Sequence, residues 1–411
     1  MQLTKIRQSF DRTRLEDIEG TAYQSVLESG LTLPEGARVA VTAGSRGVAN
    51  IAVILRAICA AVRKLGGDPF VIPAMGSHGG ATAQGQRELI ASYGVTEENV
   101  GAPIVSSMKV AELDASGLGH RLFMDKSAYE AYGVIAVNRV KVHTDFHGPF
   151  ESGVMKMCVI GLGKHAQALE MHSFGVHGLR DLIPPAARTV IASGKILLGV
   201  GIAENAYDET AQVRAALPQD IERMETELLA WNREHMPSLP VEELDVLMID
   251  RMGKDVSGVG IDTNIIGRMR IAGEAEPESP RIRMIVVDDL TEATHGNATG
   301  MGLADLVTEQ FKEKIDFPAT YENVLTSSFV MRGNLPIVTK NAAEAFRHAL
   351  RCCGRSRQNS PYVIRMIDTL HLEELYVSQA VLEIVKDLPY VEVTGDTMEI
   401  TREDGNLTPW A

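Results

Sequence analysis

The sequence contains little cysteine, and the four residues that it has (Cys59, Cys158, Cys352 and Cys353) form no CxxC pair. Zinc ribbons and the common iron–sulfur clusters are built on such pairs, so this spacing gives them no support. A disulfide framework is not indicated either, because two of the cysteines are adjacent and the others lie far apart. We therefore expect a reducing compartment, which predicts a cytoplasmic location.

Long apolar runs and an excess of basic residues are also absent. The longest apolar segment, residues 51–62, is interrupted by Arg56 and is too short to span a bilayer. Residues 1–20 hold no apolar stretch of the kind found in a signal peptide. Lys and Arg number 40 against 54 Asp and Glu, a net charge of −14, which argues against a nucleic-acid scaffold. We therefore expect neither a membrane nor a nucleic acid among the partners.

The rest of the composition is that of a globular protein. Hydrophobic residues make up 45% and charged residues 23% of the 411 positions, which excludes global disorder and indicates a large buried core. At ~100–200 residues per domain, this length predicts two domains or three. Pro237 and Pro240 mark the expected boundary, which divides the chain into residues 1–238 and 239–411.

Strand-like and helix-like patterns alternate along the first half of the chain, with strands at 38–43, 69–73 and 133–141 and helices at 48–65 and 82–93. Strand–helix–strand repeats of this length indicate a parallel sheet with helices on its faces. Ligands bind beyond the carboxyl ends of the strands in such sheets. We therefore expect the loops that carry Arg46, His78 and His143 to lie at one edge.

The same alternation continues in the second half, with strands at 195–202, 244–250 and 283–289, helices at 217–235, 302–313, 340–352 and 371–386, and a closing hairpin at 390–400. The sequence therefore predicts an α/β fold. We expect two α/β domains with mainly parallel sheets and an active-site cleft between them.

Three glycine-containing loops follow predicted strands. The loop at 76–80 precedes a helix, where backbone N–H groups suit an anion, although a plain strand-to-helix turn fits it equally well. The loop at 43–47 carries Arg46, which is able to clamp a carboxylate or a phosphate with two hydrogen bonds or simply to lie on the surface. The loop at 251–268 carries Lys254 near the preceding strand end.

Five of the eleven histidines lie within 35 residues, at positions 143, 147, 165, 172 and 177. Imidazole serves as acid, base and metal ligand near neutral pH. His143 and His147 have the HxxxH spacing of a metal pair on one helix face, but Gly148 follows at once and position 144 is not Glu, so the motif departs from a zincin. A metal hydrolase that uses these two residues stays open as an alternative.

With these residues in view, the chain resembles the nickel-pincer nucleotide-dependent lactate racemase family of 2-hydroxyacid racemases and epimerases. Residues 76–78 are similar to the family's glycine–threonine–histidine loop, and Lys156 is similar to the lysine that carries its cofactor. His172 lies 16 residues after Lys156, which is the family's separation for the nickel-binding histidine. Arg46 matches the arginine of the first strand loop, and Lys254 is similar to the substrate-holding lysine of the second domain.

The resemblance implies a specific cofactor, the nickel pincer nucleotide (pyridinium-3,5-bisthiocarboxylate mononucleotide nickel). The nickel of this cofactor has one carbon and two sulfur donors within the nucleotide itself. The resemblance implies that Lys156 tethers the cofactor and that His172 binds the nickel. Ser45, Gly76 and Arg46 are the further residues expected to contact the cofactor.

Inversion at C2 of a hydroxy acid is consistent with such a cofactor. Removal of the C2 hydrogen as a proton would place a second negative charge beside the carboxylate. Removal as hydride gives a neutral ketone instead, and a protein has no hydride acceptor of its own. Two opposed histidines then exchange the hydroxyl proton, and the resemblance assigns this role to His78 and to His143 or His147. It assigns the substrate carboxylate or the cofactor phosphate to Arg46 and Lys254.

The chain departs from the family at several positions. The second catalytic histidine of the family lies ten residues before the lysine, whereas His143 lies thirteen and His147 nine residues before Lys156. We favour His143, because it directly follows the strand predicted at 133–142. Three positions also differ in residue type: Ala43 replaces an aspartate, Gly47 a proline and Met155 an arginine. We therefore expect a substrate larger or more polar than lactate, such as a sugar acid.

The expected function is that of an isomerase, a 2-hydroxyacid racemase or epimerase. Residues 1–238 are expected to carry the cofactor and the catalytic histidines, and residues 239–411 to close the substrate cleft. The expected partners are a small 2-hydroxy acid and the enzymes that synthesise the cofactor. The remaining alternative is a non-catalytic homologue that binds a nucleotide or an organic anion at the same sheet edge.

Overall fold

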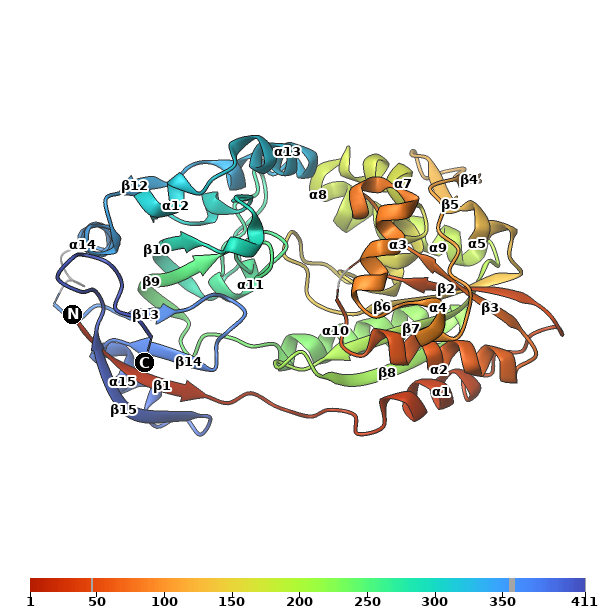
Figure 1. The fold of residues 1–411 in the computed structure, drawn as a ribbon, viewed down its shortest axis with the longest axis horizontal. Coiled ribbons are helices and arrows are strands. Elements are labelled where there is room, and N and C mark those ends of the chain that lie inside the picture. Colours follow the sequence, from red (N-terminus) through yellow and green to blue (C-terminus); the bar gives the residue numbers. More distant parts are fainter. Residues whose placement is uncertain (46, 355–358, 411) are drawn as a thin grey trace. The chain divides into compact units, whose positions relative to one another are not determined.

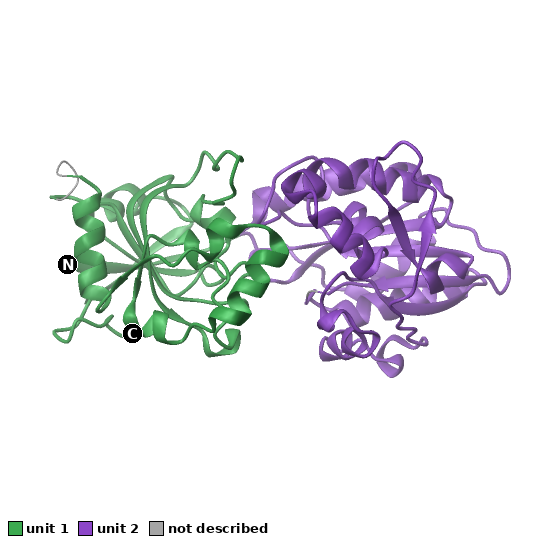
Figure 2. Cartoon of the chain, turned by 90° about the horizontal axis from the view of Figure 1, so that it is seen from above, with its two compact units in different colours: residues 1–10, 237–411 green, residues 11–236 purple. Residues whose placement is uncertain are grey.

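The computed structural model describes residues 1–45, 47–354 and 359–410. The chain forms two compact units (Figure 2): unit 1 comprises Met1–Phe10 and Pro237–Ala411, and unit 2 comprises Asp11–Met236. Each unit is built on a sheet with helices packed against it, so the predicted α/β class with mainly parallel strands is confirmed.

Unit 2 is built on a sheet with the strand order β3-β2-β6-β7-β8 (Figure 1). Its strands are β2 (Arg38–Ala43), β3 (Asp68–Pro73), β6 (Gly133–Arg139), β7 (Ile196–Glu204) and β8 (Thr210–Ala216), and β4 (Val110–Leu113) and β5 (Leu122–Asp125) form a separate hairpin. The neighbours from β3 to β7 pair in parallel, and β8 pairs antiparallel with β7.

The helices of unit 2 connect and cover these strands. They are α1 (Ile18–Leu27), α2 (Ile51–Lys64), α3 (Ala83–Ser92), α4 (Glu97–Val100), α5 (Lys126–Glu130), α6 (Val154–Lys156), α7 (Lys164–His172), α8 (Gly175–His177), α9 (Ile183–Ala192) and α10 (Ile221–His235). Two π-helical turns, Met157–Gly161 and Gly178–Leu182, join α6 to α7 and α8 to α9.

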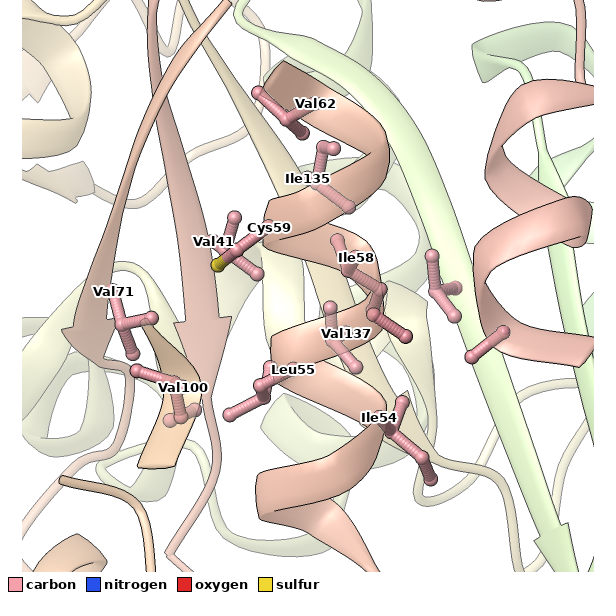
Figure 3. Packing of buried hydrophobic residues seen from close by; sticks show 14 of the residues in the cluster. Val41, Ile54, Leu55, Ile58, Cys59, Val62, Val71, Val100, Ile135 and Val137 are labelled. Carbon is pink, nitrogen blue, oxygen red and sulfur yellow. The ribbon is translucent and has the colours of Figure 1, made fainter. Parts of the chain in front are cut away.

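The core of unit 2 forms where α2 packs on the sheet (Figure 3). Apolar residues recur along α2 at helical spacing, and Ile54, Leu55 and Ile58 are fully buried. They pack in one cluster with Val41 of β2 and Val137 of β6. Each such side chain contributes about 1.5–3 kcal/mol when it leaves water. This packing holds the strands in register, so that the loops after them emerge at one edge.

Unit 1 has the strand order β12-β11-β10-β9-β13-β14-β1-β15. The strands are β1 (Gln2–Gln8), β9 (Glu243–Met252), β10 (Arg281–Leu290), β11 (Leu306–Thr308), β12 (Ile337–Thr339), β13 (Val363–Met366), β14 (Glu374–Val377) and β15 (Val391–Glu399). The helices are α11 (Thr263–Ile266), α12 (Glu309–Glu313), α13 (Phe317–Ser327), α14 (Ala342–Cys352) and α15 (Gln379–Val385). In this order, each neighbouring pair among the first five strands, β12-β11-β10-β9-β13, is parallel. The remaining pairs, β13 with β14, β14 with β1 and β1 with β15, are antiparallel.

The predicted division of the chain is wrong for residues 1–10. The sequence placed them in the N-terminal domain, but they belong to unit 1. The reason is that β1 lies between β14 and β15 and pairs antiparallel with both. Its partners lie more than 360 residues away in sequence, and no local pattern reveals a pairing over such a distance.

The C-terminal third differs from the predicted elements in three places. The expected hairpin at 390–400 is the single strand β15, which bulges opposite β1 where Gly395 has a φ of +85°. In each of the two ranges predicted as helices, 302–313 and 371–386, the structure has a short strand followed by a shorter helix. These are β11 and α12 in the first range and β14 and α15 in the second. In both cases pairing within the sheet overrides the local helical pattern.

Within the described residues, we find no helix with both the length and the apolar character needed to cross a membrane.

Candidate active site

The loops that follow β2, β3 and β6 come from the carboxyl ends of neighbouring parallel strands. Gly76 lies so close to α7 that a Cβ at this position would be 2.8 Å from Cβ of Ala168. A Cβ at Gly44 would be 3.3 Å from Oδ1 of Asn138, at the end of β6. The loop after β3 therefore packs against α7 and the loop after β2 against the end of β6, and all three loops leave the sheet at the edge where ligands of this architecture bind.

Lys156 and His143 are in direct contact at this edge. Nζ of Lys156 lies 2.5 Å from Nε2 of His143. Lys156 is the last residue of α6, a helical turn that starts after Gly153, and His143 follows the end of β6. Both side chains are half-buried. Two candidate residues thirteen positions apart thus share one hydrogen bond.

The imidazole of His143 is held by its own loop. Its backbone N–H donates to Oε2 of Glu151 over 2.6 Å, and Nδ1 accepts the backbone N–H of Asp145 over 3.0 Å. The ring stacks on Phe146, with 4.6 Å between the ring centroids. Because Nδ1 is occupied by a backbone donor, Nε2 is the nitrogen directed at Lys156.

Glu151 is the buried anchor of this loop. Its carboxylate accepts from Nη2 of Arg233 at 2.6 Å and lies 3.3 Å from Nδ1 of His147. Burial opposes ionisation, but the hydrogen bonds from His147, from the His143 backbone and from Arg233 hold the pKa of Glu151 below its usual range. Glu151 therefore serves as an ionised cap for the loop. His147 is exposed and faces Glu151.

His172, near the end of α7, belongs to the same electrostatic environment. Burial lowers the pKa of His172, the positive charge of Lys156 lowers it further, and the carboxylate of Asp145 opposes the change. His172 is therefore held as a neutral imidazole at neutral pH, which is the form that binds metals. The structure thus brings Lys156 and His143 into contact, and His172 lies within electrostatic range of Lys156.

Lys164 has a different environment, although it lies only eight residues after Lys156. Its side chain is fully buried, Nζ donates to the carbonyl of Pro73 over 2.6 Å, and Asp125 forms an ion pair with it at 3.7 Å. Burial lowers the pKa of Lys164, and Asp125 opposes this effect. The backbone of Lys164 has a φ of +57°, a strained conformation for a residue with a side chain. These contacts assign it to the support of the β3 end.

The other candidates of unit 2 lie in the loops that follow β2 and β3. Ser45 is half-buried, and its carbonyl accepts from the hydroxyl of Tyr93 over 3.0 Å. Gly76 is buried, and its carbonyl accepts from the side chain of Gln86 over 3.0 Å. His78 is exposed in the loop that follows β3. Arg46 lies outside the described residues.

Lys254 belongs to unit 1, in the loop that follows β9. Its side chain is exposed, and Nζ donates to Oδ1 of Asn323 on α13. Its backbone N–H donates to Oγ1 of Thr294 over 3.2 Å. The loop that carries Lys254 is therefore fixed to neighbouring segments of its own unit.

The metal-hydrolase alternative finds no geometric support in the described part of the chain, which holds no group of three or more His, Cys, Asp or Glu side chains arranged to bind a metal ion. His143 faces Lys156, whereas His147 faces Glu151. The HxxxH spacing therefore does not produce a pair of ligands on one helix face.

Sequence reasoning missed several polar residues that build the site. Three of them lie on α10: Glu225, Asn232 and Arg233. Burial raises the pKa of Glu225 to about 7, against the lowering effect of backbone N–H groups at Met155 and Val154. The available signal was a glutamate and an asparagine among the apolar residues on one face of a predicted helix.

No family model and no curated protein matches the chain. Among solved structures, it is similar to the lactate racemase apoprotein from Thermoanaerobacterium thermosaccharolyticum, with 11% sequence identity and a TM-score of 0.49. The alignment covers 95% of this chain and 96% of that chain. At this identity and TM-score, the likeness assigns neither a function nor site residues.

Proposed function

We propose that the protein is a 2-hydroxyacid racemase or epimerase that works with a lysine-tethered nickel pincer nucleotide. The observation that carries this proposal is the contact of 2.5 Å between Nζ of Lys156 and Nε2 of His143, within the electrostatic reach of His172. The family resemblance assigns these three residues to the tether, the base and the nickel ligand.

The chemistry of the donor set fits the cofactor. Lys156 supplies a half-buried primary amine, which is the group that a thioamide tether requires. The lowered pKa of His172 favours the neutral imidazole that binds nickel. The nucleotide supplies the carbon and sulfur donors itself, so one protein ligand suffices. Lys164 fits less well as a tether, because its amine is fully buried between Pro73 and Asp125.

The bound cofactor would supply the hydride acceptor and donor for C2 of the substrate. In the proposed reaction, Nε2 of His143 accepts the hydroxyl proton and later returns it. His78 would serve the opposite face from the loop after β3. Arg46 and Lys254 would neutralise the substrate carboxylate, as the resemblance implies.

The geometry favours His143 over His147 as the second base. His143 contacts Lys156 directly, whereas His147 is exposed and lies 3.3 Å from the buried carboxylate of Glu151. A proton acceptor must lie within hydrogen-bond reach of the substrate, which would bind next to the tethered ring. We therefore propose that His147 supports the loop through Glu151.

The proposed substrate is a 2-hydroxy acid larger or more polar than lactate, with sugar acids as candidates. This choice rests on Ala43 and Gly47, small residues that replace the aspartate and the proline of the family beside Arg46. Gly47, in the first loop, would leave more room for a substrate chain than a proline, whereas Ala43 is the buried last residue of β2.

The direct test is chiral chromatography. The full chain is produced together with the cofactor-synthesis enzymes, and single enantiomers of a panel of 2-hydroxy acids are incubated with it. We expect one acid to be converted to its epimer or enantiomer, with one nickel per chain, and no conversion by Lys156→Ala. Nickel-independent ligand binding that survives both His78→Ala and His143→Ala, without any conversion, would instead support a non-catalytic binding protein.

A further inference from the structure

Glu225 is a buried acid without an assigned role. It projects from α10, its side chain is fully buried, and Oε2 accepts the backbone N–H of Met155 over 2.8 Å. The backbone N–H of Val154 also lowers the pKa of this carboxylate. Oε1 is buried without a hydrogen-bond partner in the described structure. The carboxylate therefore caps the start of the helical turn that ends at Lys156.

The absence of a side chain at Gly153 makes room for this carboxylate. A Cβ at Gly153 would lie 2.3 Å from Oε1 of Glu225, so only glycine allows the acid to approach the turn. The carbonyl of Gly153 accepts from Nδ2 of Asn138, at the end of β6, over 2.8 Å. Met155 is thus held by α10, and Gly153 by the end of β6.

The same helix also holds the segment that carries His143. Oδ1 of Asn232 accepts the backbone N–H of Val142 over 2.9 Å. Arg233 donates to Glu151, whose other oxygen accepts the backbone N–H of His143. One rigid helix therefore fixes the backbone on both sides of the contact between Lys156 and His143.

We propose that Glu225 is a positioning residue of the proposed reaction: its carboxylate fixes the turn that presents Lys156 to His143. This inference rests on the proposed function for its biological meaning, but its geometry is tested on the apoprotein. A buried carboxylate is a costly way to cap a helical turn, since Ser, Thr or Asn supply an oxygen without a buried charge. Its raised pKa is a further sign of that cost.

The test compares three variants of the full chain without cofactor. Glu225→Ala removes the cap, Glu225→Gln keeps one acceptor oxygen, and Leu228→Ala is the matched control. Leu228 is fully buried on the same helix, packs against Gly201 of β7 and offers no polar atom to the turn. Hydrogen exchange of the backbone amides and the imidazole NMR signals of His143 are measured in each.

We expect Glu225→Ala to speed exchange at the amides of Val154 and Met155 at least tenfold and to shift the His143 signals. Glu225→Gln should restore both readouts to within about threefold of the unmodified protein. Leu228→Ala should lower the melting temperature and leave both readouts unchanged. If Glu225→Ala does not fold, Gly153→Ala provides the second test, because its methyl group displaces the carboxylate and should shift the same His143 signals.

An unchanged His143 spectrum in the folded Glu225→Ala or Gly153→Ala variant would overturn the inference, as would an identical shift in Leu228→Ala. Failure of the proposed function gives a different result. In that case the unmodified protein, produced with the cofactor-synthesis enzymes, carries no adduct on Lys156, whereas the exchange and NMR results on the apoprotein stand.

Discussion

Two lysines of unit 2, eight residues apart, have contrasting environments. Lys156 is half-buried and contacts the titratable nitrogen of His143. Lys164 is fully buried, and its amine is held by the carbonyl of Pro73 and the carboxylate of Asp125. Burial alone therefore does not separate the lysine of the proposed tether from a structural one. The two amines differ in their partners, because an imidazole exchanges protons near neutral pH and a backbone carbonyl does not.

The largest expected effect concerns Lys156 itself. Lys156→Ala should abolish racemisation to below detection and remove the nickel, because the proposed tether is gone. The melting temperature should change little, since the side chain is only half-buried. Nickel analysis and chiral chromatography measure the first two outcomes. Retained stoichiometric nickel would contradict the assignment.

The second prediction separates the two histidines near Lys156. His143→Asn should lower kcat by about 10²–10⁴-fold, the usual contribution of a positioned acid–base group. His147→Asn should lower kcat less than tenfold, because in the proposed site His147 supports the loop through Glu151. Steady-state kinetics of both variants, loaded equally with nickel, give the comparison. The reverse order would identify His147 as the base.

Lys164 should behave as a structural residue. Lys164→Met leaves the carboxylate of Asp125 buried without its partner, which costs about 3–5 kcal/mol of folding stability. The double variant with Asp125→Asn should recover much of this loss, because no uncompensated charge remains. Denaturant unfolding measures both. The folded fraction of Lys164→Met should still carry the adduct on Lys156, and its absence there would instead favour Lys164 as the tether.

The smallest expected effect is a pH dependence at Glu225. Its pKa is raised from 4.5 to about 7 in the folded protein, so the folded state binds the proton more tightly than the unfolded state. The associated stability is fully present below pH ~4.5 and is lost as the pH rises through ~7, by roughly 3 kcal/mol. Glu225→Gln cannot ionise, so its stability should rise relative to the unmodified protein between pH 5 and 8. Thermal unfolding should show that the difference in stability between Glu225→Gln and the unmodified protein increases as the pH rises from 5 to 8.

The sequence predicts the strands, helix and loops around the candidate site well, because each of them has a local pattern of residues. Periodicity predicts the strands at 38–43 and 69–73 and a helix at 48–65, which in the structure is α2 (Ile51–Lys64), and Ser45, Gly76 and His78 follow from the strand ends. The packing of these loops at one sheet edge is a consequence of parallel pairing.

The parts that escaped prediction depend on contacts distant in sequence. Glu225 bonds to Met155, in the turn of Lys156, across 70 residues of sequence. The local sequence around a buried glutamate does not indicate which residue it will contact. The same limit applies to β1, whose partners β14 and β15 lie at the other end of the chain. The spacings of His143 and His147 from Lys156 differ from the family's by three residues and by one, so the preference for His143 rests in the sequence on its place after the predicted strand, and the observed partners support it.

The most direct measurement is peptide mass mapping of the full chain produced with the cofactor-synthesis enzymes. The account predicts a stoichiometric adduct of the cofactor's mass on the peptide that contains Lys156, and an unmodified Lys164. An adduct on Lys164, or nickel-loaded active protein with no adduct on Lys156, would contradict it.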